Sequence, residues 1–167
     1  MSTLTIPSAL IDARDEISLL LPALDAHIWL AQFNEAADGD LSHVWPMFGR
    51  WLLLDAEHGV IQYAETEQQR ALINNAAAGN AINCNLIFGA VARATGAGYA
   101  AAYSANPAAI HSAVYPTAYA LYTAAHVAQG SATNAVIAHA TAHMAAGKSS
   151  AVQTQAEQLL SLMRIES

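Results

Sequence analysis

Between Arg70 and Lys148 the chain carries a single charged residue, Arg93. About a quarter of the residues in a typical soluble domain are charged. We therefore expect a segment of this length without charge to be buried against other helices or other subunits rather than exposed to water. Its apolar content is mostly alanine, which has the highest helix propensity but buries little surface per side chain. The segment therefore predicts helices that pack closely through small side chains, within the protein or against other subunits.

Polar side chains argue against a membrane-spanning interpretation of this segment. A span needs about 20 predominantly apolar residues in a row. Amide, imidazole and hydroxyl groups interrupt the segment throughout, at Asn74, Asn75, Asn80, Asn83, Asn85, His111, Ser112, Thr117, His126, Gln129 and Asn134. Burial, or self-association as a homo-oligomer, explains the missing charges better than a lipid environment does.

The 167 residues predict one all-α domain over 1–167, because 54% are hydrophobic and no fixed repeat is present. Three regions follow from composition: an acidic N-terminal region, 1–67, a charge-poor alanine-rich helical region, 68–147, and a C-terminal helix over 150–165. We expect a compact bundle of about six to nine short helices. A loose helical stack is the alternative arrangement.

The segment around residues 42–63 has two interpretations. Apolar residues at i, i+3, i+4, i+7 and i+8 predict an amphipathic helix with Ser42 as its N-cap and Gly59 as the glycine that follows it. Those residues are Val44, Met47, Phe48, Trp51 and Leu52. The alternative is a β-hairpin near 50–63 that turns at Glu57–Gly59. The helical interpretation is favoured.

Five further signals predict helix boundaries. Pro22 separates the first two helices, and "TEQQ", Thr66–Gln69, is a capping-box pattern. The glycines at 96 and 98 predict a joint between helices, and Pro116 predicts a kink or a restart. Gly130 then turns the chain between two antiparallel helices.

The stretch "AHATAH" places His139 and His143 on one helical face, one turn apart. Two histidines at this spacing are half of a zinc or other transition-metal site, although the glutamate of the zincin motif is absent. The alternative is a pair of core histidines whose polar atoms are satisfied by the hydroxyls of Tyr119 and Tyr122. The core interpretation is favoured.

A second group of candidate ligand residues lies on the preceding helix. His111, Tyr119, Tyr122 and His126, together with Tyr115, form one stripe if residues 111–126 are a single helix. Such a stripe can line a pocket for a small molecule or a haem group, whereas aromatic residues at helical spacing are more often part of a core. Together with His139 and His143, this group defines the alternative function, a metal- or small-molecule-binding protein. This alternative covers enzymes as well as non-catalytic binding proteins.

The acidic region favours a different function, the binding of another protein. Residues 1–67 hold eleven acidic and two basic residues, a net charge of −9. An acidic surface accelerates encounter with a basic partner, although it also simply maintains solubility. The candidate partner-binding residues are Asp12, Asp15, Glu16, Glu35, Asp38, Asp40, Glu57, Glu65 and Glu67.

Several functions are disfavoured by what the sequence lacks. A formal net charge of −7 and the absence of a basic cluster exclude nucleic acid as the expected partner. Phosphate-binding loops, nucleophile elbows and dinucleotide fingerprints are missing, so a protein that is not an enzyme and needs no cofactor is favoured. The lone Cys84 and the absence of a secretory signal predict a cytoplasmic protein.

The segment "ARATGAGYAAAYSA", residues 92–105, resembles in composition the alanine- and histidine-rich helical proteins classed as bacterial immunity proteins. The resemblance covers fourteen residues and assigns no functional residue. An immunity-type or antitoxin-type inhibitor of a basic effector is one example of the protein-binding function that the acidic region favours. We therefore expect an immunity-like, antitoxin-like or adaptor protein that uses its acidic N-terminal surface.

Overall fold

The computed structural model describes residues 5–80, 82–105 and 109–165, and throughout these ranges the fold is all-α, as predicted. Eight α-helices and one 3₁₀-helix, η1, occur there. Their bounds are α1 Ser8–Leu20, α2 Ala23–Ala36, α3 Val44–Leu54, η1 Val60–Tyr63, α4 Glu67–Ala77, α5 Cys84–Ala105, α6 Ala109–Ala128, α7 Ala132–Ala145 and α8 Ala151–Met163.

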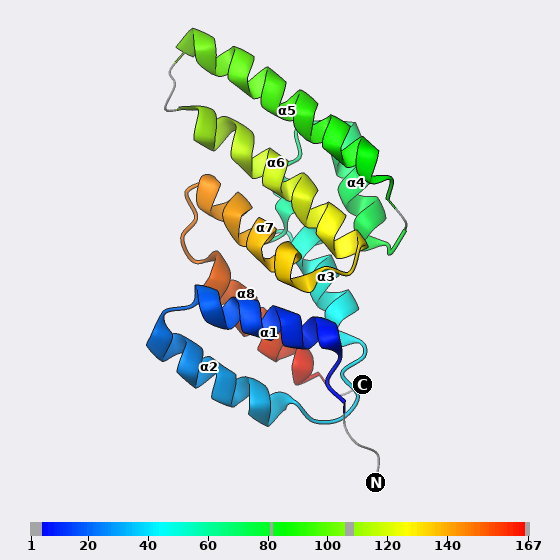
Figure 1. Cartoon of the computed structure of the whole chain (residues 1–167), viewed down its shortest axis with the longest axis vertical. Coiled ribbons are helices and arrows are strands. Elements are labelled where there is room, and N and C mark those ends of the chain that lie inside the picture. The colour runs from blue at the N-terminus through cyan, green and yellow to red at the C-terminus, as the bar shows by residue number, and fades with distance from the viewer. Residues whose placement is uncertain (1–4, 81, 106–108, 166–167) are drawn as a thin grey trace.

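The helices are arranged in two rows (Figure 1). One row runs in the order α5, α6, α7, α1, α2, and α4, α3 and α8 lie behind it. The N-terminal helix α1 is inserted between α7 and α2, so the row does not follow the order of the chain. The fold is compact, as predicted, and its eight described α-helices are within the expected range of six to nine.

Helices from the two ends of the sequence share one hydrophobic core. The largest buried side chains in it include Phe33 of α2, Phe48 of α3 and Leu159 of α8. The indole N–H of Trp29 donates a hydrogen bond to the carbonyl of Ala156 at 2.9 Å, which joins α2 to α8 inside this core. The acidic N-terminal region is thus packed directly against the last helix.

The position of α6 and α7 explains why these two helices lack charges, whereas α5, from the same charge-poor segment, is exposed at many of its described residues and still carries only Arg93. Both helices lie in the middle of the row, and most described side chains of α7 are buried, including Ala135, Val136 and Ala142. Small side chains at these positions allow close contact with the helices on either side. In the described ranges, no helix is both long enough and apolar enough to cross a membrane.

Several predicted boundaries are confirmed and others are wrong. Pro22 separates α1 from α2, and the capping box at the start of α4 is present, with Thr66 and Gln69 bonded reciprocally. The expected joint at glycines 96 and 98 is wrong, because α5 continues through it. Pro116 lies inside an uninterrupted α6.

The alternative β-hairpin near 50–63 is also wrong. The chain forms α3, a tight turn at Asp55–Gly59, and η1. The N-cap of α3 is His43 rather than Ser42, whose backbone N–H is bonded instead to the carboxylate of Asp40 at 2.9 Å.

The turn Asp55–Gly59 is held by the side chain of its first residue. The Asp55 carboxylate accepts hydrogen bonds from the backbone N–H groups of Glu57 and His58, at 3.0 and 2.9 Å. The N–H of Gly59 donates to the Asp55 carbonyl at 2.9 Å. Gly59 does not directly follow α3, which ends at Leu54, and its φ of −73° is not the left-handed conformation of a capping glycine. It is required for space, since a Cβ there would lie 2.4 Å from the Asp55 nitrogen.

We predict that Gly59→Ala lowers the free energy of unfolding by about 2 kcal/mol or more, because the added methyl group collides with backbone atoms that cannot move separately. Urea denaturation measures the effect. Gly96→Ala is the matched control, since nothing lies within 4 Å of its added Cβ and the site is helical. That control should raise stability by up to about 1 kcal/mol. Equal effects of the two substitutions would contradict the prediction.

Candidate functional site

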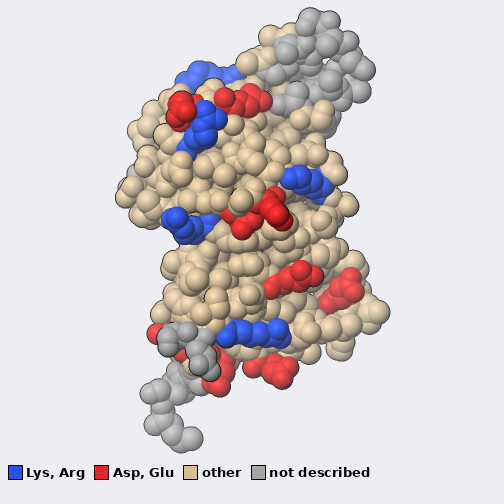
Figure 2. All heavy atoms as spheres, turned by 180° about the vertical axis from the view of Figure 1, so that it is seen from behind, with Lys and Arg blue, Asp and Glu red and all other residues tan. Residues whose placement is uncertain are grey.

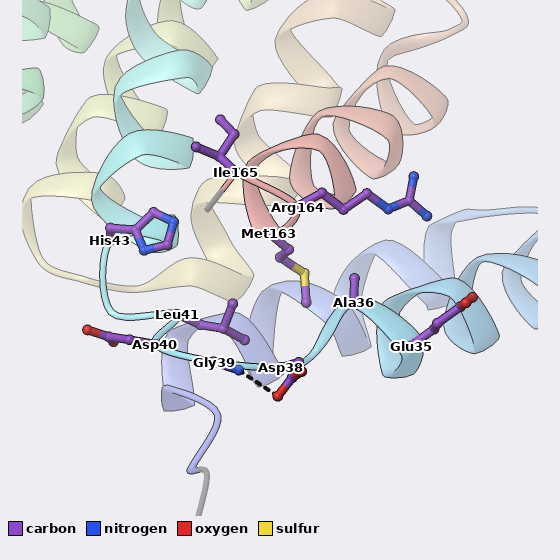
Figure 3. Close-up of a pocket in the computed structure, with 10 residues that line it drawn as sticks. All are labelled: Glu35, Ala36, Asp38, Gly39, Asp40, Leu41, His43, Met163, Arg164 and Ile165. Carbon is purple, nitrogen blue, oxygen red and sulfur yellow. Dashed lines mark hydrogen bonds between the residues drawn. The ribbon is translucent and has the colours of Figure 1, made fainter. Parts of the chain in front are cut away.

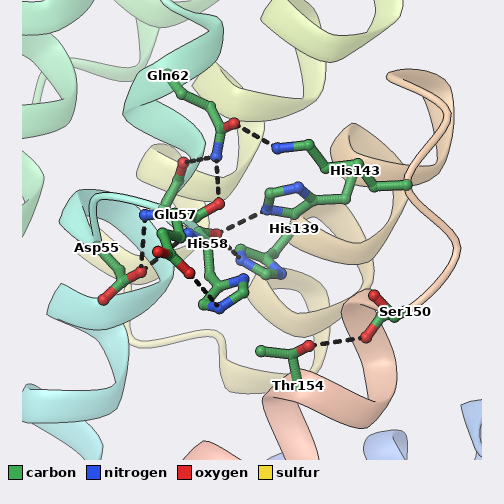
Figure 4. A network of polar contacts seen from close by, with 10 residues as sticks. Asp55, Glu57, His58, Gln62, His139, His143, Ser150 and Thr154 are labelled. Atoms are coloured by element: carbon green, nitrogen blue, oxygen red, sulfur yellow. Dashed lines mark hydrogen bonds and ion pairs between the residues drawn. The ribbon is translucent and has the colours of Figure 1, made fainter.

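His139 and His143 of α7 both point at the turn Asp55–Gly59 (Figure 4). The Nε2 atoms of the two rings lie 2.8 and 2.7 Å from one atom, the carbonyl oxygen of His58. The ring centroids are 4.5 Å apart. Both residues are buried, with 1% and 3% of their surface exposed. The one-turn spacing seen in the sequence therefore does place two imidazoles side by side.

Hydrogen bonding determines the protonation state of each ring. A carbonyl can only accept, so each Nε2 must carry a proton and donate it to His58. The two Nδ1 atoms then act as acceptors: from the Gln155 amide nitrogen at 2.7 Å for His139, and from the Tyr63 hydroxyl at 2.6 Å for His143. The His139 ring is consequently neutral, the burial that lowers the pKa of His143 favours the neutral form of that ring as well, and all four ring nitrogens are engaged.

The partners of this histidine pair differ from those the sequence suggested. Tyr119 and Tyr122 do not bond to either ring. Their own rings pack edge to face with centroids 5.9 Å apart, and the two residues contact different core clusters. The prediction of core histidines with satisfied polar atoms is supported, but the tyrosine that satisfies one of them is Tyr63 of η1.

The other candidate ligand residues do not join the pair. His126, near the end of α6, is partly buried, and its Nδ1 atom is buried without a hydrogen-bond partner. Burial lowers its pKa. The backbone of His111 belongs to α6, but its side chain lies outside the described part of the structure. The described part of the stripe, Tyr115 to His126, therefore continues along one helix without converging on His139 and His143.

Burial dominates the electrostatics of the pair. It lowers the pKa of His139 to about 3, with the nearby His143 acting in the same direction. Burial also lowers the pKa of His143, and the Lys148 ammonium adds to this effect. The hydrogen bonds to the His58 carbonyl oppose both shifts without overcoming them. Both imidazoles therefore stay uncharged at neutral pH.

This arrangement fits a metal poorly. A metal ion needs the lone pair of a ring nitrogen, and the only lone pairs are on the two Nδ1 atoms, which already accept hydrogen bonds. Across the described residues, no group of three or more His, Cys, Asp or Glu side chains is placed to hold a metal ion. The adjoining cavity measures about 20 Å³, room for about one water molecule.

Other side chains lock the turn and η1 against the rest of the protein. The Gln62 amide donates to the carbonyls of Glu57 and Gly59, and its oxygen accepts from the Lys148 ammonium at 2.6 Å. Thr117 of α6 donates to the carbonyl of Tyr63 at 2.8 Å. These contacts hold the His58 carbonyl in position for the two imidazoles.

The nine candidate partner-binding residues are all on or near the surface, and only Glu16 among them is partly buried. They come from α1, the end of α2, the segments that precede α3, η1 and α4, and the first residue of α4. On the face shown in Figure 2, acidic side chains form separate small groups with Lys and Arg between them. Two candidates form ion pairs with an arginine, Asp15 with Arg14 and Glu67 with Arg70.

Three of these candidates meet in a groove between the end of α2 and the end of α8. The groove has a volume of about 500 Å³. Figure 3 shows Leu41 and Met163 in its middle, with Glu35 and Asp40 at opposite ends. Its complete lining is Glu35, Ala36, Asp38, Gly39, Asp40, Leu41, His43, Met163, Arg164 and Ile165. Hydrogen bonds from Ser42 lower the pKa of Asp40, so this carboxylate is ionised at neutral pH.

Sequence reasoning missed the residues that complete the histidine network. His58 contributes a backbone atom, which no side-chain motif can reveal. Tyr63 and Gln155 lie 80 and 16 residues from their histidine partners. The only usable signal for Gln155 is its place on the apolar face of α8, where a fully buried amide needs a polar partner.

No protein-family model, curated protein or solved structure matches the chain. The groove and the histidine network are therefore the features of the described structure that bear on its function.

We predict that Tyr63→Phe lowers the free energy of unfolding by about 1–2 kcal/mol, because the buried Nδ1 atom of His143 loses its only donor. Denaturation in urea gives the value. Tyr122→Phe is the matched control: the Tyr122 hydroxyl has no hydrogen-bond partner in the described ranges, so its loss should change stability by less than about 0.5 kcal/mol. A loss no larger for Tyr63→Phe than for Tyr122→Phe would refute the proposed role of the hydroxyl.

We also predict that the protein loses stability as pH falls from about 6.5 to 4.5. Below pH 6.5 the unfolded chain binds protons on histidines that stay neutral when folded, so protons favour the unfolded state. Each such histidine contributes a slope of up to about 1.4 kcal/mol per pH unit. Denaturant titrations across this range measure the slope. His139→Gln should flatten it, whereas substitution of the exposed His27 by Gln should leave most of it, and a flat wild-type profile is the contrary result.

Proposed function

We propose that this protein acts by binding a basic segment of another protein rather than by catalysis, and that the groove between α2 and α8 is the binding site. The observation that carries the proposal is the meeting of Glu35, Asp38 and Asp40 around the apolar side chains of Leu41 and Met163. A partner segment with alternating basic and apolar residues would complement this lining, the carboxylates directing encounter and the apolar centre contributing burial.

The charges in the groove support a cationic partner with a defined orientation. Arg164 also lines the groove, so the three carboxylates are only partly balanced. An arginine or lysine of the partner would be attracted to the α2 side, whereas Arg164 would repel it from the α8 side. An immunity-like or antitoxin-like inhibitor of a basic effector, or an adaptor, would act in this way.

The histidine network gives no support to a metal- or small-molecule-binding function. Its ring nitrogens are committed to structural hydrogen bonds, and its cavity is far smaller than the roughly 300 Å³ of a small-molecule site. The alternative function, a metal- or small-molecule-binding protein with a site lined by His and Tyr, therefore gains no specific support from these residues.

The test uses a labelled nonapeptide of alternating arginine and leucine, with fluorescence polarisation as the measurement. We predict that Glu35→Lys/Asp38→Lys weakens binding by about tenfold, because two favourable charge contacts become repulsive. Asp25→Lys/Glu157→Lys is the control pair, since both residues are exposed, neither lines the groove and the change in net charge is the same. This pair should weaken binding by less than about threefold.

Equal weakening by the two pairs would mean that net charge alone attracts the peptide, and the groove would not be the site. Failure of the wild-type protein to bind the arginine–leucine peptide any better than a glutamine–leucine peptide would reject the basic partner itself.

A further inference from the structure

A second groove, here called the α3–α8 groove, lies between those two helices. Its volume is about 320 Å³. Its lining from α3 is Met47, Arg50, Trp51 and Leu54, and its lining from α8 is Gln158 and Leu162. Most of these side chains are apolar, and Arg50 is the basic group among them. The groove therefore differs in charge from the acidic groove between α2 and α8.

The two grooves are neighbours along α3 and α8. On the α3 side, His43 lines the acidic groove and Met47, about one helical turn further on, lines the α3–α8 groove. On the α8 side, Ile165 lines the acidic groove (Figure 3) and Leu162 lines the α3–α8 groove. The N–H of Ile165 donates to the carbonyl of Leu162 at 3.3 Å, so these two residues also lie one turn apart. A single bound segment can therefore pass from one groove into the other.

Apolar side chains are exposed where the two grooves meet. Met47 is 41% exposed and Ile165 is 47% exposed. Trp51 adds a fixed surface beyond them, because its ring is stacked on that of Phe48 with centroids 5.8 Å apart. Exposed aliphatic side chains next to a rigid aromatic ring are typical of the centre of a protein-binding site.

Arg50 gives the α3–α8 groove a positive charge that is available to a ligand. Its side chain is exposed, and within the described ranges it forms no ion pair or hydrogen bond. The Asp55 carboxylate also lines this groove, but it accepts hydrogen bonds from the backbone N–H groups of Glu57 and His58. The Arg50 guanidinium can therefore pair with a carboxylate of a bound segment.

We propose that one segment of the partner protein occupies both grooves, with basic residues in the acidic groove, apolar residues across Met47 and Ile165, and an acidic residue on Arg50. This inference rests on the proposed function of the acidic groove and adds the order of charges in the partner. From His43 to Leu54 the chain extends for about 16 Å, which an extended peptide spans with about five residues. The basic and acidic residues of the partner are then separated by about that length.

The order of charges distinguishes this partner from one that is only basic. The protein has a formal net charge of −7, so long-range attraction favours the most basic ligand. A peptide that gains glutamates should bind more weakly unless a local cation receives them. Tighter binding of the less basic peptide is therefore a result that net charge does not produce.

The experiment is fluorescence polarisation with two labelled peptides. Both begin with alternating arginine and leucine, and they continue with leucine alternating either with glutamate or with glutamine. We expect the wild-type protein to bind the glutamate peptide about fivefold more tightly than the glutamine peptide. Arg50→Glu should reverse this preference, because a carboxylate then faces the glutamates. Arg93→Glu is the matched control and should keep the preference, since Arg93 lies on α5, lines neither groove and gives the same change in net charge.

A second pair of variants tests the apolar junction. Met47→Ser should weaken binding of the glutamate peptide by about threefold or more, because its exposed side chain would be covered by the peptide. Met144→Ser is the matched control, since this methionine of α7 is also exposed and lines neither groove. Equal weakening by the two substitutions would overturn a path across Met47.

The outcomes separate this inference from the function on which it rests. If Glu35→Lys/Asp38→Lys weakens binding of both peptides but the wild-type protein prefers the glutamine peptide, the acidic groove remains the binding site and the α3–α8 groove is not part of it. A preference for glutamate that persists in Arg50→Glu has the same meaning. If Glu35→Lys/Asp38→Lys weakens neither peptide, both proposals are rejected. Circular dichroism checks the fold of each variant, and Arg50→Gln, which should abolish the preference for glutamate, replaces Arg50→Glu if that variant does not fold.

Discussion

One backbone oxygen, the carbonyl of His58, holds together segments that lie 81 and 85 residues apart in the chain. It can serve two imidazoles because a carbonyl oxygen has two lone pairs, and it faces them because Asp55 and Gly59 shape the turn beneath it. The orientations of Tyr63 and Gln155 follow from the protons that this oxygen imposes on the rings. The central part of the protein is therefore organised by a polar contact inside an apolar stack.

Around this contact, stability comes from close packing of small side chains. A core rich in alanine buries little area per residue, so it depends on helices approaching closely over long distances. The two rows meet this requirement by placing α6 and α7 between other helices and by inserting α1 beside α7. Charged side chains would have no room and no water there. The acidic groove lies outside this packed centre, between the ends of α2 and α8.

The groove and the histidine pair are separate parts of the molecule with different chemistry. The groove joins the ends of α2 and α8 and presents ionised carboxylates to solvent, which suits recognition of a cationic partner. The pair lies under the turn that follows α3 and is neutral because it is buried. The proposed partner binding depends on the groove, whereas the predicted loss of stability in acid depends on the pair. Each can therefore be tested with the other intact.

Local pattern and composition were sufficient to predict the helices. Alanine content, the proline at 22 and the capping box at Thr66–Gln69 each affect the conformation of the neighbouring backbone, so their effect can be predicted without the tertiary structure. The same local signals favoured a core setting for His139 and His143. They did not predict that Gly59 is needed for space or that α5 runs through its glycines, since neighbouring backbone and packing decide both. The partners of the histidines, and the meeting of Glu35, Asp38 and Asp40 with α8, depend on contacts between residues far apart in the chain. Only the packed tertiary structure brings those residues together.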